Sequence, residues 1–399
     1  MRRLRNSGTR AASCSTEAVV KKFIYADNAA TTRLDKDALD AMMPYLTGEY
    51  GNASQPYFFA GPAKKAIAAA RETVAECIGA EPEEIFFTSG GTESDNWAIK
   101  SALFAKGSRR EVITSRVEHH AVLNACRSLS ELGIPVNYLS VDSKGTVQPE
   151  TLKEIISGRT WLVSVMLANN EIGTIEPVQE LCAIAHESGA LFHTDAVQAV
   201  GHIQIDVKKL GVDMLSSSAH KFNGMKGSGF LYIRKGVKIH QYADGGSQER
   251  GQRAGTENVA SIVAMAAALK KNCERMSESS ERLHKLEQVL LGRLSEEGID
   301  YIRNGSENRL PGNINISIKG ANGEMLLHRL DLKGICISTG SACDSVNQRV
   351  SHVIEAIGVP QKYANGTLRI TFGAENTEEE ASVIAAAICA ILNTKPVAR

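Results

Sequence analysis

The sequence lacks long hydrophobic runs, an excess of charge of either sign and closely spaced cysteine pairs. No apolar run approaches the ~18–20 residues that a membrane-spanning helix needs, so we expect no contact with a membrane. Lysine plus arginine and aspartate plus glutamate total 45 each, and this zero net charge argues against nucleic acid as a direct partner. None of the eight cysteines has CxxC spacing, which argues against a zinc site, and their scatter fits a reducing compartment such as the cytoplasm.

The first 22 residues differ in composition from the rest of the chain. We expect a basic, disordered extension over 1–22, because such a segment has little to bury. An acid-poor leader rich in arginine and serine also fits an organelle transit peptide, which would place the protein in an organelle matrix. The only acidic residue is Glu17, against six basic residues: Arg2, Arg3, Arg5, Arg10, Lys21 and Lys22.

The 399 residues suffice for about two domains. We assign 23–257 to a large cofactor-binding domain, although its first residues are also compatible with the second domain. Short apolar segments alternate there with amphipathic ones, which predicts an α/β fold with a mostly parallel sheet covered by helices on both faces. The expected strands are 85–88, 112–115, 136–140, 162–167, 191–194, 214–218 and 229–233, and the expected helices include 63–77, 121–132 and 178–188.

The pattern changes near residue 257, and we assign 258–399 to a connector helix and a smaller α+β domain. Thr377 and Glu380 have the spacing of a capping box, which predicts the start of a closing helix. The expected elements are a helix over 259–297, strands over 313–318, 335–338 and 368–372, and a helix over 377–392.

Polar residues follow four of the expected strands, at the sheet edge where α/β proteins bind their ligands. In residues 87–93 a strand stops, Gly90 and Gly91 turn the chain, and a helix is expected from Thr92. Such a turn, which we call the anion seat, can bind an anion through backbone N–H groups. It matches neither nucleotide-binding glycine pattern, and taken alone it is more often an ordinary connection capped by Thr92.

Two further segments supply amide and carboxylate groups. Asn169 and Asn170 close one strand, where they either satisfy a turn or donate to a ring oxygen. Asp195 closes another strand, where it either caps a helix or pairs with a ring nitrogen and keeps it protonated.

The fourth segment, 216–224, brings hydroxyls, His220 and Lys221 to a strand end. A lysine amine can hold a cofactor covalently once its pKa falls below its usual ~10.4. Lys226 is a nearby alternative that the spacing does not exclude. An anion seat, a carboxylate for a ring nitrogen and a lysine together predict pyridoxal 5'-phosphate as the cofactor.

In these motifs the sequence resembles the cysteine desulfurases of the class-V aminotransferase group, which are fold type I pyridoxal-phosphate enzymes. The resemblance runs from residue 25 past Arg369, and it implies a homodimer whose large domain binds the cofactor. It is carried by YADNAATT, TSGGTES, EHHAV, NNEIG, HTDAVQ, SAHKFNG, QERGQRAGTEN and TGSACDS.

The resemblance implies a role for each matching residue. Lys221 corresponds to the lysine that holds the cofactor, His119 to the histidine stacked on its ring, and Cys343 to the catalytic thiol. Arg369 corresponds to the arginine that binds the substrate carboxylate, with Asn170 nearby. The other expected cofactor contacts are Gly91, Thr92, Asn170, Asp195, Gln198, Ser218, His220 and, from the second subunit, Thr256.

The implied reaction converts L-cysteine to L-alanine and leaves its sulfur on Cys343 as a persulfide. The sulfur then passes to an acceptor protein, which serves either iron–sulfur cluster assembly or tRNA thiolation. A free thiol is largely protonated at neutral pH, so Cys343 needs a nearby proton acceptor. Cys336, in an apolar strand, fits an ordinary buried cysteine. A selenocysteine lyase and a non-catalytic sulfur-transfer scaffold are the alternatives.

Four positions depart from the family pattern. Tyr57 stands where a histidine is usual, and Ala374 and Glu375 replace an arginine and a phenylalanine. Asp344 puts a carboxylate beside Cys343, which disfavours the thiolate. These changes leave the acceptor, the rate and the substrate preference open.

Overall fold

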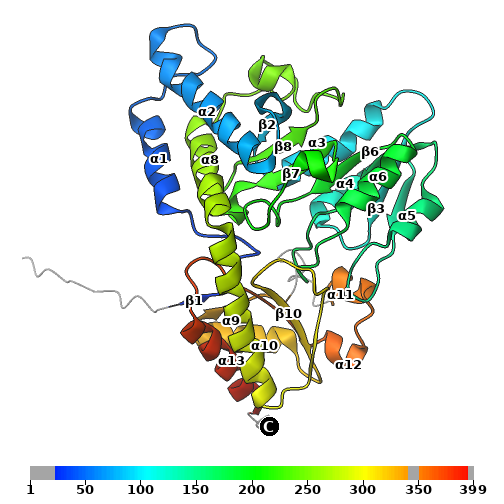
Figure 1. The fold of residues 1–399 in the computed structure, drawn as a ribbon, viewed down its shortest axis with the longest axis vertical. Coiled ribbons are helices and arrows are strands. Elements are labelled where there is room, and N and C mark those ends of the chain that lie inside the picture. The colour runs from blue at the N-terminus through cyan, green and yellow to red at the C-terminus, as the bar shows by residue number, and fades with distance from the viewer. Residues whose placement is uncertain (1–22, 340–349, 394–399) are drawn as a thin grey trace, which may run out of the picture.

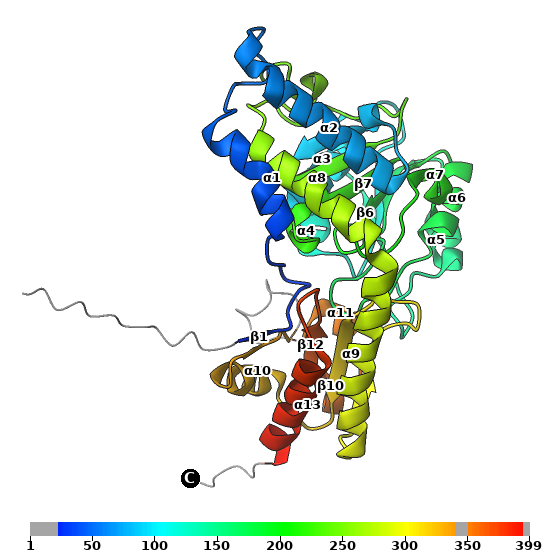
Figure 2. The same cartoon turned by 60° about the vertical axis from the view of Figure 1, so that its left-hand side comes forward.

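The computed structural model describes residues 23–339 and 350–393, which form two lobes (Figure 1). Helices α8 (Val259–Glu274) and α9 (Met276–Glu296) run from the large lobe into the small one (Figures 1 and 2). The single helix expected over 259–297 is therefore two helices. The backbone of Arg275 leaves the helical conformation (φ −104°, ψ 7°), which divides them.

The large lobe is built on a seven-stranded sheet with the order β2-β8-β7-β6-β5-β3-β4. Strand β8 runs antiparallel to both its neighbours and the other pairs are parallel, as the alternation of strands and helices predicts. The strands are β2 (Ile85–Thr88), β3 (Glu111–Ser115), β4 (Val136–Leu139), β5 (Thr160–Ser164), β6 (Leu191–Asp195), β7 (Met214–Ser218) and β8 (Gly229–Ile233).

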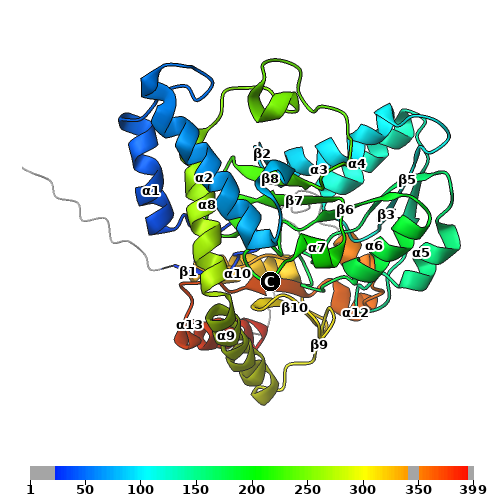
Figure 3. The same ribbon diagram turned by 45° about the horizontal axis from the view of Figure 1, so that its top comes forward.

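Side chains of the sheet alternate between two hydrophobic cores, because successive strand residues point to opposite faces. Ile85 and Phe87 lie in the core beneath α1, α2, α6 and α8, whereas Phe86 lies in the core beneath α3 and α4. Figure 3 shows α2 and α8 side by side on the first face. The helices of this lobe are α1 (Lys36–Thr47), α2 (Gly61–Ile78), α3 (Gly91–Lys100), α4 (His120–Glu131), α5 (Pro149–Ile155), α6 (Val178–Glu187) and α7 (Val207–Leu210).

The small lobe contains an antiparallel sheet of order β12-β10-β9, together with a parallel pair that joins β1 to β11. The first described strand therefore belongs to the small lobe. Its elements are β1 (Ile24–Tyr25), β9 (Tyr301–Arg303), β10 (Asn313–Ile318), β11 (Ile335–Cys336), β12 (Thr367–Thr371), α10 (Gly323–Leu332), α11 (His352–Ala356), α12 (Gln361–Ala364) and α13 (Glu378–Asn393).

The capping box expected at the closing helix is present. Thr377 Oγ1 accepts from the Glu380 N–H at 3.2 Å, and Glu380 Oε2 accepts from the Thr377 N–H at 3.3 Å. Among the described helices, none combines the length and the apolar character that crossing a bilayer requires.

The small-lobe core provides a test of this packing. Leu290 of α9 is fully buried, whereas Leu332 of α10 is 77% exposed. Leu290→Ala should lower the free energy of unfolding by about 2–5 kcal/mol, because it leaves a cavity. Leu332→Ala removes the same atoms from the surface and should change it by less than about 0.5 kcal/mol. Urea unfolding followed by circular dichroism measures both values, and equal effects would contradict the buried position of Leu290.

Candidate active site

The carboxyl ends of β5, β6 and β7 and the start of α3 open onto a cavity of about 230 Å³. A single water needs about 10–15 Å³ on this measure, so the cavity has room for an organic ring. Of the described residues that the sequence predicts for the cofactor or substrate, all except Thr256 line it. The lining residues are Ala29, Ala30, Gly91, Thr92, Asp95, His119, Met166, Asn170, Asp195, Val197, Gln198, Ser218, His220, Lys221 and Arg369.

The anion seat lies where β2 turns into α3. Gly90 has φ 146° and occupies the N-cap, so α3 begins at Gly91, one residue earlier than expected, and Thr92 is not the cap. A Cβ on Gly91 would lie 2.5 Å from Val197 Cγ2, so a larger residue does not fit there. Gly91 and Thr92 line the cavity, so the N–H groups and positive dipole end at the start of α3 favour an anion there.

Lys221 projects into the cavity from the short 3-10 helix η4 (Ala219–Lys221) that follows β7. Its Nζ donates to the Ala29 carbonyl at 2.5 Å and to the Ala30 carbonyl at 2.8 Å. Lys226 is exposed and does not line the cavity. The geometry therefore favours Lys221 over Lys226, a choice that the sequence spacing leaves open.

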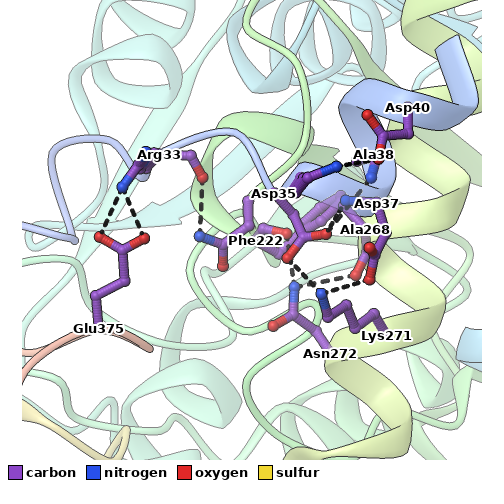
Figure 4. A network of polar contacts seen from close by, with 12 residues as sticks. Arg33, Asp35, Asp37, Ala38, Asp40, Phe222, Ala268, Lys271, Asn272 and Glu375 are labelled. Atoms are coloured by element: carbon purple, nitrogen blue, oxygen red, sulfur yellow. Dashed lines mark hydrogen bonds and ion pairs between the residues drawn. The ribbon is translucent and has the colours of Figure 1, made fainter.

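Hydrogen bonds join the turn after Lys221 to the segment before α1 and to α8 (Figure 4). Asn223 adopts a left-handed conformation (φ 65°), and its Nδ2 donates to the Arg33 carbonyl at 2.9 Å. Asn272 of α8 donates to the Phe222 carbonyl at 2.6 Å. Glu375 of the small lobe, one of the departures from the family pattern, pairs with Arg33 at 3.1 Å, and both side chains are exposed.

Two carboxyl groups share the cavity wall. Burial raises the pKa of Asp195 to about 6, although the Val197 N–H, which donates to Oδ1 at 2.9 Å, and the charge of Lys221 lower it. Asp95 is also buried, its Oδ1 has no hydrogen-bond partner, and burial and the charge of Asp195 raise its pKa. Like charges this close disfavour ionisation of both groups.

His119 is the N-cap of α4, and its Nδ1 accepts from the Ala121 N–H at 3.1 Å. Burial, followed by the charge of Lys221, lowers the pKa of His119 to about 4. The ring is therefore neutral at pH 7, and since Nδ1 accepts, Nε2 carries the proton.

Arg369 reaches the cavity from β12 of the small lobe and is almost completely buried. Its Nη1 donates to the Asn170 carbonyl at 3.2 Å and its Nη2 donates to Asp27 Oδ1 at 2.8 Å. Its Nε is buried without a partner. A guanidinium with a spare N–H is suited to bind a carboxylate.

Cys343 and Asp344 lie outside the described residues, but the chain on both sides of them lies near the cavity. Ser338 and Arg369 exchange backbone hydrogen bonds of 3.0 and 2.7 Å. His352 Nε2 donates to the Glu118 carbonyl at 3.0 Å, directly before His119. Thr256 is exposed and does not line this cavity, so its contact with a second subunit stays a prediction.

Comparison with known proteins places this geometry in a family. Residues 24–384 match the family model Aminotransferase class-V. The chain belongs to the class-V aminotransferase family. "Cysteine desulfurase IscS" of Dictyoglomus turgidum is 50% identical over 363 residues, which cover 90% of this chain and 92% of the relative. The protein of the same name from Methanosarcina thermophila is 48% identical over 360 residues, covering 90% and 89%.

Solved structures of other proteins share the fold. A "NIFS-LIKE PROTEIN" superposes with a TM-score of 0.87 at 40% identity, covering 93% of this chain and 99% of that one. "SspA in complex with cysteine" superposes with a TM-score of 0.78 at 34% identity, covering 88% and 98%. The predicted family and the predicted α/β fold are therefore confirmed.

Sequence reasoning missed two acidic residues of this class-V aminotransferase site. Asp95 lies four residues after Gly91, so one helical turn brings both to the cavity, a spacing that offers a signal for it. Asp27 pairs with Arg369 from 342 positions away, and no local pattern indicates that contact.

The neutral ring of His119 can be tested by histidine-selective ¹⁵N NMR between pH 5 and 8. A histidine with the ordinary pKa of ~6.5 is mostly protonated at pH 6, whereas a pKa of about 4 leaves His119 almost entirely neutral there. We expect a neutral Nε2–H signal that disappears in the His119→Asn variant. A midpoint near 6.5 for that signal would contradict the burial argument.

Proposed function

We propose that this protein is a pyridoxal-phosphate-dependent cysteine desulfurase, which converts L-cysteine to L-alanine and transfers the sulfur. One observation carries the proposal: Lys221, Asp195 and His119 line the same cavity as Arg369. Curated relatives named cysteine desulfurase, and a structural neighbour described as a complex with cysteine, support the substrate.

The residues present fit pyridoxal 5'-phosphate. Lys221 would hold its aldehyde, the start of α3 with Ser218 and His220 would hold its phosphate, and Asp195 would pair with its ring nitrogen. The helix start at Gly91 and the buried carboxyl groups line the same cavity as Lys221, and this set of groups suits a ring that carries both a phosphate and a protonated nitrogen. When bound, this group draws electrons from the substrate Cα and so weakens the bonds there.

The chain's own side chains would orient the substrate and move its protons. Arg369 would bind the carboxylate beside Asn170, since its Nε is buried and unpaired. The neutral ring of His119, which carries its proton on Nε2, and the amine of Lys221 would exchange protons with the substrate.

The sulfur step is assigned to Cys343. Its thiolate attacks the substrate sulfur, so that an S–S bond forms on Cys343 while the Cβ–S bond of the substrate breaks. The carbon skeleton takes up a proton and leaves as alanine, and one sulfur atom stays on Cys343 as a persulfide. The flanking contacts of Ser338 and His352 support this assignment, because the chain on both sides of the segment lies beside the cavity.

We further propose a cytoplasmic homodimer in which Thr256 of each subunit serves the other's cavity. Its exposure and its absence from the lining of its own cavity support this arrangement. The persulfide would pass to an acceptor protein of iron–sulfur cluster assembly or tRNA thiolation. The basic extension 1–22, which would decide between cytoplasm and an organelle matrix, lies outside the described residues.

Mass spectrometry after incubation with L-cysteine tests the proposal. The peptide that contains Cys343 should gain one sulfur atom, and alanine should form. Cys343→Ala should lose both products, with alanine formation falling by at least ~100-fold because the nucleophile is removed. Cys336→Ala is the matched control and should keep both. Sulfur on another cysteine, or undiminished alanine formation by Cys343→Ala, would contradict the proposal.

A further inference from the structure

A partly buried ion pair connects the anion seat to the loop over 248–256. Arg253 Nε donates to Glu93 Oε1 at 2.8 Å, and Arg253 Nη2 donates to Oε2 at 3.1 Å. The two side chains are 25% and 9% exposed. Glu93 Oε2 also accepts from the N–H of Ser89 at 3.0 Å and from its hydroxyl at 2.5 Å. Glu93 therefore fixes the turn before α3 on one side and Arg253 on the other.

This arrangement puts a carboxylate next to a site for an anion, because Glu93 directly follows Thr92 of the cavity wall. Among the described lining residues, Lys221 and Arg369 are the only lysine and arginine. Burial, followed by the charge of Lys221, lowers the pKa of His220 to about 4, so its ring is neutral at pH 7. An unbalanced charge on Glu93 would therefore repel a phosphate bound at the start of α3.

The positive charge of Arg253 balances the negative charge of Glu93. Burial alone would raise the pKa of Glu93, but the hydrogen bonds from Arg253 and Ser89 lower it below its usual value. Glu93 is therefore ionised at pH 7, and the bidentate guanidinium matches its charge.

We infer that Glu93 and Arg253 are positioning residues for the phosphate group of the cofactor. Glu93 holds the turn at Ser89 in the shape that binds the phosphate, and Arg253 cancels the negative charge that Glu93 brings there. This inference rests on the proposed function, since it takes pyridoxal 5'-phosphate as the ligand.

The loop does not depend on Arg253 for its position. Glu249, in the short 3-10 helix η5 (Gln248–Gly251), is buried and has a left-handed conformation (φ 44°). Its carboxylate accepts from Arg71 at 2.6 and 2.8 Å and from the Phe87 N–H at 3.0 Å. Substitution of Arg253 should therefore change the charge near the phosphate while the loop stays attached to β2.

Equilibrium binding to the cofactor-free full-length protein tests the inference, with pyridoxal 5'-phosphate and pyridoxal, which lacks the phosphate, as the two probes. Arg253→Gln should weaken binding of the phosphorylated probe by roughly 10-fold or more and that of pyridoxal by less than about 3-fold. The double variant Glu93→Gln/Arg253→Gln should return to within about 3-fold of the unmodified protein, since neither charge remains and the amide oxygen of Gln can still accept from Ser89. Arg253→Lys, which keeps the charge, should retain the preference for the phosphorylated probe.

Arg303→Gln is the matched control, because it breaks an ion pair of similar burial with Glu287 in the small lobe, with side chains 20% and 11% exposed. It should leave both affinities unchanged. Equal weakening of both probes by Arg253→Gln, no weakening, or no recovery in the double variant would overturn the inference. Failure of the unmodified protein to bind pyridoxal 5'-phosphate would instead overturn the proposed function together with the inference.

Discussion

The structure depends on one contact, in which a partly buried lysine amine finds its hydrogen-bond acceptors. Lys221 receives them from the carbonyls of Ala29 and Ala30, in the segment that connects β1 of the small lobe to α1 of the large lobe. The same segment also bonds to His220, the residue before Lys221. Thr32 donates to the His220 carbonyl through its N–H and its hydroxyl, each at 2.9 Å. Both lobes are therefore tied together at the residue proposed to hold the cofactor.

Burial in the protein interior, where the dielectric constant is low, determines which side chains near this contact stay charged. Burial makes His119 and His193 neutral at pH 7, with pKa values of about 4 and about 3. Charges persist where they are matched, as in the pairs of Arg369 with Asp27 and of Arg253 with Glu93. The cavity therefore presents few net charges, and a small displacement of charge within a ligand is weakly screened there.

Local sequence patterns, such as the alternation of strands and helices, predicted most of the large lobe and the lining of the cavity. The strand ends that carry Asp195, Ser218 and Lys221 follow from alternation, because parallel strands bring their carboxyl ends to one edge. Contacts between distant segments were not predictable in this way. The pairing of Ile24 with Ile335 and the contact of Asp27 with Arg369 depend on how the two lobes meet, and no local propensity encodes them.

Borohydride reduction tests whether Lys221 holds the cofactor covalently. The full-length protein is incubated with pyridoxal 5'-phosphate, reduced and digested, and the modified lysine is located by tandem mass spectrometry. We expect the label on Lys221, its loss in Lys221→Ala and its retention in Lys226→Ala. Label on Lys226, or no trapped label at all, would contradict it.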